Sequence, residues 1–374
     1  MLTQSYGIVM KAKAAVYVGA NKPFEVREFD VVEPPAGYGR SQLIASGVCG
    51  TDLHIHNGKL DEAAPAIIGH EFIGKLDALD PAESEKYGLK VGDNVIADIA
   101  VPCGECLLCR TGDDANCVNM GVTNGGDINE SPYLWGGYTE VNFTPLTNLI
   151  KIPDSLDPTM VSVFACPGPT GMHSFALARR AGVVLEELEC AVVQGLGPVG
   201  MFGLAYLKAI GVRRVFAVTS GKNEERDKIA YRLGAERVFA LSRQSADEID
   251  DILRAETGGL GVDLAFEASG APAAVAQGID MLRCRGVYLV PGQYSMSGGV
   301  SIQPQAITFK ALHIIGSSQY SIPDVRAYLE FLVQHPELHE VIRGMAVSYP
   351  VSDVNRAFDD AGAGRNVKTV LVKG

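Results

Sequence analysis

The sequence predicts an α/β protein in which a mostly β first part precedes a doubly wound, parallel sheet of six strands. Between residues 189 and 316, short β-branched runs alternate with segments of helical periodicity, which is typical of parallel strands joined by crossover helices. Before residue 165, short strand-like runs are separated by glycine and proline turns, and long helical patterns are few. A chain of 374 residues is long enough for two or three domains, each with its own core.

The strands of the first part are expected where apolar, β-branched and aromatic residues stand between turn residues. They are residues 14–18, 24–32, 41–46, 72–79, 94–99 and 138–143. The central part supplies six candidates, the number of strands in a doubly wound sheet: residues 190–194, 214–219, 237–241, 262–268, 286–291 and 312–316. Pro198 marks a helix start, and Ile229 with Leu233, like Ile249 with Leu253, recur at helical spacing.

The tail after residue 316 alternates helix and strand patterns. It predicts a helix over 323–334, a strand over 345–349, a helix over 351–361 and a final strand over 368–372. We expect these elements to return to the first domain, so that the central unit is an insertion. The predicted domains are residues 1–167, 168–315 and 316–374.

Composition and charge exclude several classes of protein. The hydrophobic share of 47% and the charged share of 20% are those of a folded globular chain and exclude a disordered one. A formal net charge of −12 without a basic stripe argues against nucleic acid as a partner. Because no segment approaches about 20 consecutive apolar residues and the first 15 residues lack the order of a signal peptide, we expect no membrane contact and a cytoplasmic location.

Four of the eight cysteines lie close together in a turn-rich segment. Two, two and seven residues separate Cys103, Cys106, Cys109 and Cys117. Four thiolates complete a tetrahedral zinc shell and leave no position for a substrate, so the spacing predicts a structural zinc site. An iron–sulfur cluster, or four free cysteines, are the alternatives.

A second set of possible ligands is spread along the chain. Cys49, His70 and Cys166 together supply three zinc ligands and leave one position open, as in catalytic zinc sites. Taken singly, each is equally well explained as a buried cysteine or a core histidine. Thr51 and His54 follow the first ligand and are suited to removing a hydroxyl proton, because an imidazole titrates near neutral pH. For His54 the alternative is an ordinary surface histidine.

A Gly-x-Gly-x-x-Gly motif follows the first strand of the central part and precedes a predicted helix. In such a motif Gly195 permits the tight turn, Gly197 lets the backbone approach a pyrophosphate, and Gly200 allows close packing of the helix. The motif therefore predicts a dinucleotide site, with a merely structural glycine turn as the alternative.

In these motifs and their order, the chain resembles the zinc-containing alcohol dehydrogenases of the medium-chain dehydrogenase/reductase superfamily over nearly its whole length. The resemblance implies a GroES-like catalytic domain and a Rossmann domain. It also implies two zinc ions per chain, a catalytic ion on Cys49, His70 and Cys166 and a structural ion on the four clustered cysteines. NAD(P), a small alcohol or carbonyl substrate and a homo-oligomer, dimeric or tetrameric, are further expectations.

The resemblance also implies roles for residues near the catalytic ligands. Thr51 and His54 match the proton relay of the family, and Glu71 matches a carboxylate close to the metal. Asp52 matches the residue that orients the ligating imidazole. Both carboxylates could instead be solvated surface residues.

Further residues match the cofactor and substrate sides of relatives. Thr170 and Val199 stand where relatives line the nicotinamide, and Lys368 stands where relatives place a cation for the pyrophosphate. A solvated lysine in an edge strand is the alternative for Lys368. Ile99 and Leu60 match positions of the substrate pocket, although either could be a core residue.

The sequence departs from the NAD-dependent pattern after the second strand of the central part. That strand ends in Thr219 and is followed by Ser220, where NAD-dependent relatives have an acidic residue that binds the ribose. Without the carboxylate, a 2′-phosphate is not repelled, and Lys222 or Arg226 could pair with it. NADP is therefore favoured over NAD. The alternative is NAD held by Ser220 and backbone groups.

The predicted activity is hydride transfer between a nicotinamide cofactor and an alcohol/aldehyde or ketone pair at a zinc site. A polyol or threonine-type zinc dehydrogenase of the same superfamily is the main alternative, although polyol relatives often have a carboxylate where Cys166 stands. The intact ligands argue against a zinc-free reductase. A non-catalytic nucleotide-binding homologue is the alternative from another class.

Overall fold

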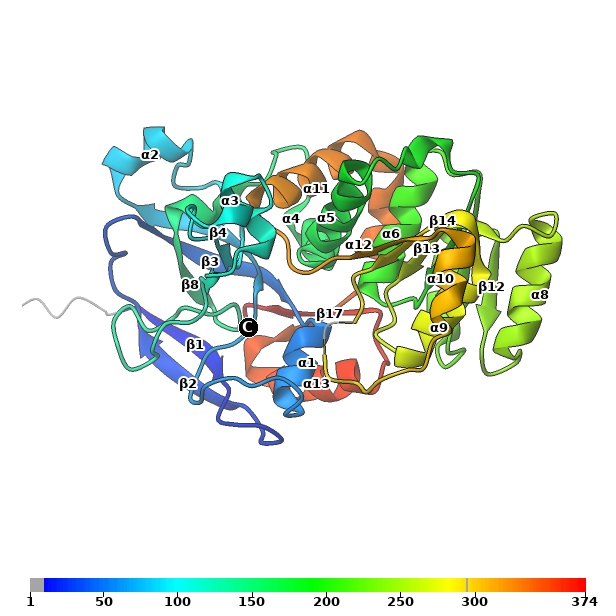
Figure 1. Ribbon diagram of the computed structural model, residues 1–374. Helices are drawn as coiled ribbons and strands as arrows, with labels where there is room; N and C mark the ends of the chain where they lie inside the picture. Colours follow the sequence, from blue (N-terminus) through cyan, green and yellow to red (C-terminus); the bar gives the residue numbers. More distant parts are fainter. Residues whose placement is uncertain (1–9, 294) are drawn as a thin grey trace, which may run out of the picture.

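The computed structural model describes residues 10–293 and 295–374, and it contains two large sheets at opposite ends of the molecule (Figure 1). Part of the N-terminal segment on which the cytoplasmic prediction depends, residues 1–9, lies outside the described residues. The first sheet has the order β16-β17-β3-β4-β5-β9, with β8 paired to β3. The second sheet has the order β12-β11-β10-β13-β14-β15, and all of its pairs are parallel.

Most strands before residue 167 belong to the first sheet, which is antiparallel apart from the pair β16 and β17. Two short sheets, β1-β2 and β6-β7, accompany it. The strands of these sheets are β1 (Lys11–Val16), β2 (Glu25–Asp30), β3 (Tyr38–Gly47), β4 (Glu71–Leu79), β5 (Asn94–Ala97), β6 (Ala100–Val101), β7 (Gly121–Val122), β8 (Val141–Pro145), β9 (Leu149–Lys151), β16 (Ala346–Pro350) and β17 (Lys368–Val372). The prediction of a mostly β first part is confirmed.

The second sheet confirms the doubly wound prediction. Its strands are β10 (Cys190–Gln194), β11 (Arg214–Thr219), β12 (Arg237–Ala240), β13 (Val262–Glu267), β14 (Leu282–Val290) and β15 (His313–Gly316). β14 begins at Leu282, four residues before the predicted start at 286, because Leu282 already pairs with Val262. The register then shifts, so that residues 283–286 bulge out before Val287 pairs with Leu264.

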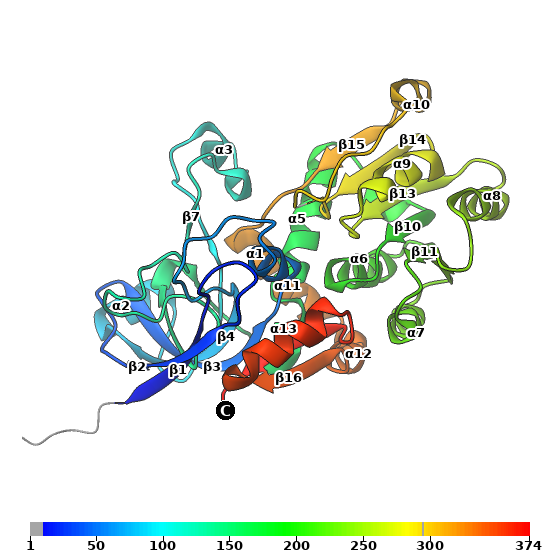
Figure 2. The same cartoon turned by 90° about the horizontal axis from the view of Figure 1, so that it is seen from below.

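Most helices flank the second sheet or lie between the two sheets, whereas α2 and α3 lie beside the first sheet (Figures 1 and 2). They are α1 (Gly50–His56), α2 (Pro81–Tyr87), α3 (Leu107–Arg110), α4 (Pro158–Val161), α5 (Pro167–Arg180), α6 (Pro198–Ala209), α7 (Glu224–Arg232), α8 (Ala246–Glu256), α9 (Pro272–Met281), α10 (Pro304–Lys310), α11 (Ile322–Gln334), α12 (His339–Arg343) and α13 (Val354–Gly362). Within the described ranges, none of these helices combines the length and apolarity needed to cross a bilayer.

Helix α5 is not among the predicted elements, because two prolines and two glycines among its first six residues resemble a loop. Pro167 is tolerated because the first position of a helix has no N–H partner to lose. The glycines are needed for packing: a Cβ at Gly168 would lie 2.4 Å from the ring of Tyr328. At Gly171 it would lie 2.5 Å from the ring of Phe202. The glycines therefore let α5 lie directly against α11 and α6.

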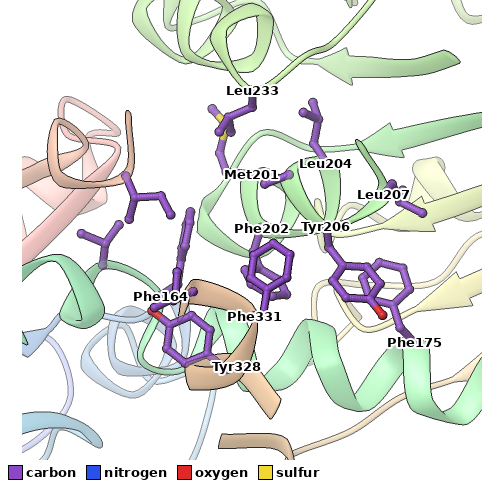
Figure 3. Close-up of a cluster of buried hydrophobic side chains, with 14 of the residues drawn as sticks. Phe164, Phe175, Met201, Phe202, Leu204, Tyr206, Leu207, Leu233, Tyr328 and Phe331 are labelled. Carbon is purple, nitrogen blue, oxygen red and sulfur yellow. The ribbon is translucent and has the colours of Figure 1, made fainter. Parts of the chain in front are cut away.

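Among the described residues, the largest of three apolar clusters runs from the first sheet through these helices to the second sheet. Phe202 of α6 lies at its centre, with ring centroids 5.7 Å from Phe164 and 5.4 Å from Phe331 (Figure 3). Tyr328 of α11 packs edge-on against the same ring at 5.9 Å. The shared core fixes the two sheets relative to each other at the closed side of the pocket described below.

The last strand of the chain lies inside the first sheet, between β16 and β3. Leu371 of β17 pairs with Ser46 of β3, while its other edge pairs with β16 in parallel. Elements after residue 316 thus contribute to the same sheet as elements before residue 167. The exact domain limits remain a prediction.

Candidate active site

A pocket of about 690 Å³ is lined by residues of α1, of strand β17 in the first sheet, and of the turns that follow β13 and β14 in the second sheet. Cys49, His70 and Cys166 line it, and so do Gly197 and Val199 of the glycine motif. Helix α1 lies between the two large sheets (Figures 1 and 2), and residues of α1 and of β17 line the pocket. The structure therefore brings the spaced ligands and the dinucleotide motif to one cavity.

The three spaced ligands meet although they lie far apart in sequence. Cys49 directly precedes α1, His70 directly precedes β4, and Cys166 directly precedes α5. Their ligand atoms, together with a carboxylate oxygen of Glu71, all lie within 4.8 Å of one another, and the two sulfurs are 4.0 Å apart. Tetrahedral Zn–S bonds of about 2.3 Å place sulfurs roughly 3.8 Å apart, so the donor set fits zinc.

Asp52 of α1 contacts both Cys49 and His70. One of its oxygens accepts a hydrogen bond from the Cys49 amide at 2.9 Å and another from the Tyr138 hydroxyl at 2.7 Å. The other oxygen lies 3.4 Å from Nδ1 of His70, which leaves Nε2 of the imidazole for a metal. Asp52 is buried, so the interpretation of a solvated carboxylate is wrong. The contribution of Tyr138 had no sequence signal, because the contact spans 86 residues.

Glu71 and Lys368 form a buried ion pair next to the ligands, with both side chains at most 1% exposed. Lys368 also donates to the carbonyl of Val48 at 3.4 Å. Gly47 is required here because a Cβ at that position would lie 1.8 Å from a carboxylate oxygen of Glu71. The strand of Lys368 is internal rather than an edge, and the lysine is buried rather than solvated. Its predicted contact with a pyrophosphate remains a prediction, although it lines the pocket.

Burial and close charges shift the pKa values of these groups. A hydrogen bond with Cys166 lowers the pKa of Cys49 well below its usual value, against the opposing effect of burial. Burial lowers the pKa of His70, but Asp52 more than compensates, so the pKa ends well above its usual value. Burial raises the pKa of Glu71 to about 7 despite the opposing charge of Lys368. In this buried site, desolvation disfavours the charged form of each group, and nearby charges and hydrogen bonds decide the direction of each pKa shift.

Thr51 and His54, the predicted relay residues, both line the pocket. The Thr51 hydroxyl lies 3.8 Å from the sulfur of Cys49, so it is adjacent to the ligand set. His54 stands one turn further along α1 and is partly buried, and burial lowers the pKa of its imidazole. Of the two predicted pocket residues, Ile99 lines the cavity and Leu60 does not.

The four clustered cysteines form a second ligand set on the lobe that carries α3. Their sulfurs all lie within 4.8 Å of one another, with 3.4 Å between Cys106 and Cys109 and 3.9 Å between Cys106 and Cys117. Hydrogen bonds from the backbone amides of Cys109 and Val118 lower the pKa of the Cys106 thiol to about 6, which favours a thiolate ligand. The geometry fits a closed tetrahedral zinc site.

Each glycine of the dinucleotide motif has a separate geometric reason. Gly195 has φ of 94°, a conformation that favours glycine, and a Cβ at Gly200 would lie 1.9 Å from the carbonyl oxygen of Gly195. A Cβ at Gly197 would meet no atom within 4 Å, so glycine there leaves open the space at the start of α6. That space suits an anionic group at a helix N-terminus. Thr170 and Val199 line the same pocket.

The residues predicted to hold the adenosine side of the cofactor are not all brought together. Arg226 lines the pocket and donates to the carbonyl of Asn366 at 3.0 Å. Thr219, Ser220 and Lys222 are not among the lining residues; Thr219 is buried and the other two are exposed. Within the described residues, no carboxylate lies within 4.0 Å of the Arg226 guanidinium, and its Nε has no hydrogen-bond partner. Arg226 is thus a partly buried cation facing the cavity.

Sequence comparisons identify the family of this fold and site. The model of the alcohol dehydrogenase GroES-like domain matches residues 42–154, and that of the zinc-binding dehydrogenases matches residues 198–334. A probable alcohol dehydrogenase of Mycobacterium tuberculosis is 30% identical over 302 residues, which cover 77% of this chain and 78% of that protein. The chain therefore belongs to the zinc-containing alcohol dehydrogenases of the medium-chain dehydrogenase/reductase superfamily, a family of oxidoreductases.

Other relatives show the range of the family. The L-threonine 3-dehydrogenase of Shewanella putrefaciens is 27% identical over 336 residues, covering 87% of this chain and 89% of that protein. The fold matches an alcohol dehydrogenase of Thermotoga maritima with a TM-score of 0.88, at 23% identity over 98% of this chain and 100% of that one.

Two further solved structures of the same fold contain a cofactor. A zinc-binding dehydrogenase of Sinorhizobium meliloti is bound to NADP, with a TM-score of 0.79 at 22% identity over 97% of this chain and 99% of that one. An alcohol dehydrogenase of E. coli is complexed with NADH, with a TM-score of 0.79 at 23% identity and the same two coverages.

Proposed function

We propose that this protein is a zinc-dependent oxidoreductase that interconverts an alcohol and its aldehyde or ketone with a nicotinamide cofactor. The observation that carries the proposal is one pocket that is lined both by Cys49, His70 and Cys166 and by Gly197 and Val199 of the glycine motif. A hydride acceptor bound along the motif would reach a substrate held at the three ligands. Family membership supports an oxidoreductase independently.

In this proposal, one group of residues holds the metal and another transfers the proton. Cys49, His70 and Cys166 hold the metal and leave a position for substrate. When bound, zinc polarises a substrate oxygen and acidifies a hydroxyl, and the nicotinamide ring accepts or returns the hydride. The Thr51 hydroxyl, next to the ligands, relays the proton, and His54 at the partly exposed end of α1 exchanges it with solvent.

The side chains around the ligands favour an alcohol with an apolar body. Ile55, Ile68, Ile99 and Val122 line the pocket on the side of the first sheet. A polyol or an amino acid would place extra polar groups against these side chains, which offer no hydrogen bonds, and this costs free energy. Asn124 and Tyr320 also line the cavity, so polar contacts are confined to other parts of the wall. Glu62 also lines the cavity, but it lies on an exposed part of the chain.

A substrate panel with metal analysis tests this proposal. We expect about two zinc ions per chain from the three-plus-four ligand sets. With zinc bound, we expect turnover of apolar primary or secondary alcohols, or of their carbonyl partners, in preference to polyols and threonine. Faster turnover of polyols or threonine would instead identify the other branch of the superfamily. Nucleotide binding without turnover across the panel would indicate a non-catalytic homologue.

We further propose that NADP is the preferred cofactor and that Arg226 is its main phosphate partner. The Arg226 guanidinium lines the pocket and has no carboxylate partner among the described residues, whereas Lys222 lies exposed and outside the pocket. Because a charged hydrogen bond contributes about 1.5–3 kcal/mol, Arg226→Gln should lower kcat/KM for NADP roughly 10- to 100-fold. The kcat/KM for NAD should change only slightly. Lys222→Gln is the matched control and should leave kcat/KM for both cofactors nearly unchanged. If the unsubstituted protein and both variants all prefer NAD, the phosphate assignment is wrong.

A further inference from the structure

The turn that follows β13 forms part of the pocket wall on the side of the second sheet. Its residues from Ala268 to Pro272 line the cavity. β13 is the neighbour of β10, the strand that leads into the glycine motif, and the strand order reverses between these two. In doubly wound folds, ligands bind in the crevice at this point. A Cβ at Gly195 would lie 2.7 Å from Cα of Ser269, so the turn and the glycine motif are in direct contact.

The last residue of β13, Glu267, fixes the course of this turn from beneath. Its side chain is 0% exposed, and Glu267 is not itself among the lining residues. One carboxylate oxygen accepts three hydrogen bonds, from the amide of Ser269 at 2.7 Å, the Ser269 hydroxyl at 2.6 Å and the amide of Gly270 at 3.0 Å. The Ser269 hydroxyl accepts in turn from the amide of Ala271 at 3.1 Å, directly before α9.

Within the described residues, the other carboxylate oxygen of Glu267 is buried without a hydrogen bond, so stabilisation of the strand alone does not explain a glutamate at this position. A Cβ at Gly292 would lie 2.5 Å from this oxygen. Gly292 also lines the pocket, and its amide donates to the Glu267 carbonyl at 2.9 Å. A buried carboxylate with an unpaired oxygen is costly, and an apolar residue would stabilise the strand better. What the carboxylate does provide is a fixed turn opposite the glycine motif.

We propose that Glu267 is a positioning residue for the nicotinamide cofactor. It holds the Ser269–Gly270 backbone at the place where the cofactor crosses from the glycine motif toward the zinc ligands, so that bound cofactor meets a preformed wall. This inference rests on the proposed function, because it assumes that the pocket binds such a cofactor. It concerns cofactor affinity and leaves the metal sites unchanged.

The test compares cofactor dissociation constants, measured by calorimetry without substrate. Glu267→Gln keeps the volume and one carbonyl oxygen but removes the charge that strengthens the three hydrogen bonds. We expect the Kd of NADP and of NAD to rise about tenfold, with zinc content unchanged and kcat at saturating cofactor changed less than about twofold. Ser269→Ala removes only the hydroxyl contact and should raise Kd about threefold, so it carries the test if the glutamine variant fails to fold.

Asp263 at the opposite end of β13 provides a matched control. Its carboxylate accepts from the amides of Glu189 and Cys190 at 2.9 and 2.8 Å, and it does not line the pocket. Asp263→Asn should lower thermal stability and leave the cofactor Kd unchanged. An equal loss of affinity in this control, or a parental Kd in both test variants, overturns the role of Glu267 alone. A parent protein that binds neither cofactor overturns the proposed function and this inference together.

Discussion

Replacing Cys49 with alanine should abolish turnover and remove one of the two zinc ions while the protein stays folded. Cys49 is one of the three residues that we propose as ligands of the catalytic zinc, and the two that remain would not hold the ion firmly. Metal polarisation supplies several kcal/mol of transition-state stabilisation, so kcat/KM should fall by about 10³- to 10⁴-fold. Zinc analysis and steady-state kinetics on the same preparation measure both effects. The lobe ion, held by four other cysteines, should remain.

Cys284 provides the control for this experiment. It is exposed and belongs to neither ligand set, so Cys284→Ala should retain two zinc ions and parental kinetics. Full activity of Cys49→Ala, or the loss of both ions from it, would contradict the assignment of the open site. Because the control also removes a thiol, a general effect of thiol loss is separated from loss of a ligand.

Replacing Lys368 with methionine should destabilise the protein strongly. The substitution leaves the Glu71 carboxylate buried without its cation, and breaking a buried ion pair from one side costs about 3–5 kcal/mol. The free energy of unfolding, measured in urea with zinc present, should fall by that amount. The double variant Glu71→Gln with Lys368→Met removes both charges and should recover more than half of the loss, because no unpaired charge remains.

An exposed pair in the same chain shows what burial adds. Lys228 lies 3.3 Å from Glu225, and both side chains are more than 60% exposed. Lys228→Met should cost less than about 1 kcal/mol, as for other surface ion pairs. A similar cost for Lys368→Met would show that the Glu71 pair contributes no more than a surface contact. If Lys368 also binds the cofactor, the double variant will recover stability but not cofactor affinity.

Features that depend on local chemistry were predictable from the sequence. The strands of the second sheet follow β-branched runs, and β10 and β11 have the predicted limits. The four-cysteine ligand set was predictable from spacing alone, since these cysteines are only a few residues apart in the chain. Gly195 and Gly200 were assigned for the same reason, because a turn and the helix start it faces are neighbours in the chain.

Features that depend on distant contacts were not predictable. The contact between Glu71 and Lys368 joins residues 297 positions apart, and no pattern in one sequence links them. Tyr138 supports Asp52 in the same way across 86 positions. Helix α5 was missed because its prolines and glycines resemble a loop until the rings that they admit, Tyr328 and Phe202, are in place. Glu267 lies beneath the pocket and has no motif of its own.

The position of β17 has a consequence for how the nascent chain folds. Cys49 and His70 leave the ribosome well before β17, so the edge of β3 next to them stays open until β17 emerges to pair with it. The strands of the doubly wound sheet, all made by residue 316, pair only with one another, so this sheet is free to form first. The chemical centre is therefore completed only after β17 has been made, and a chain cut before residue 368 would lack both this strand and the cation for Glu71.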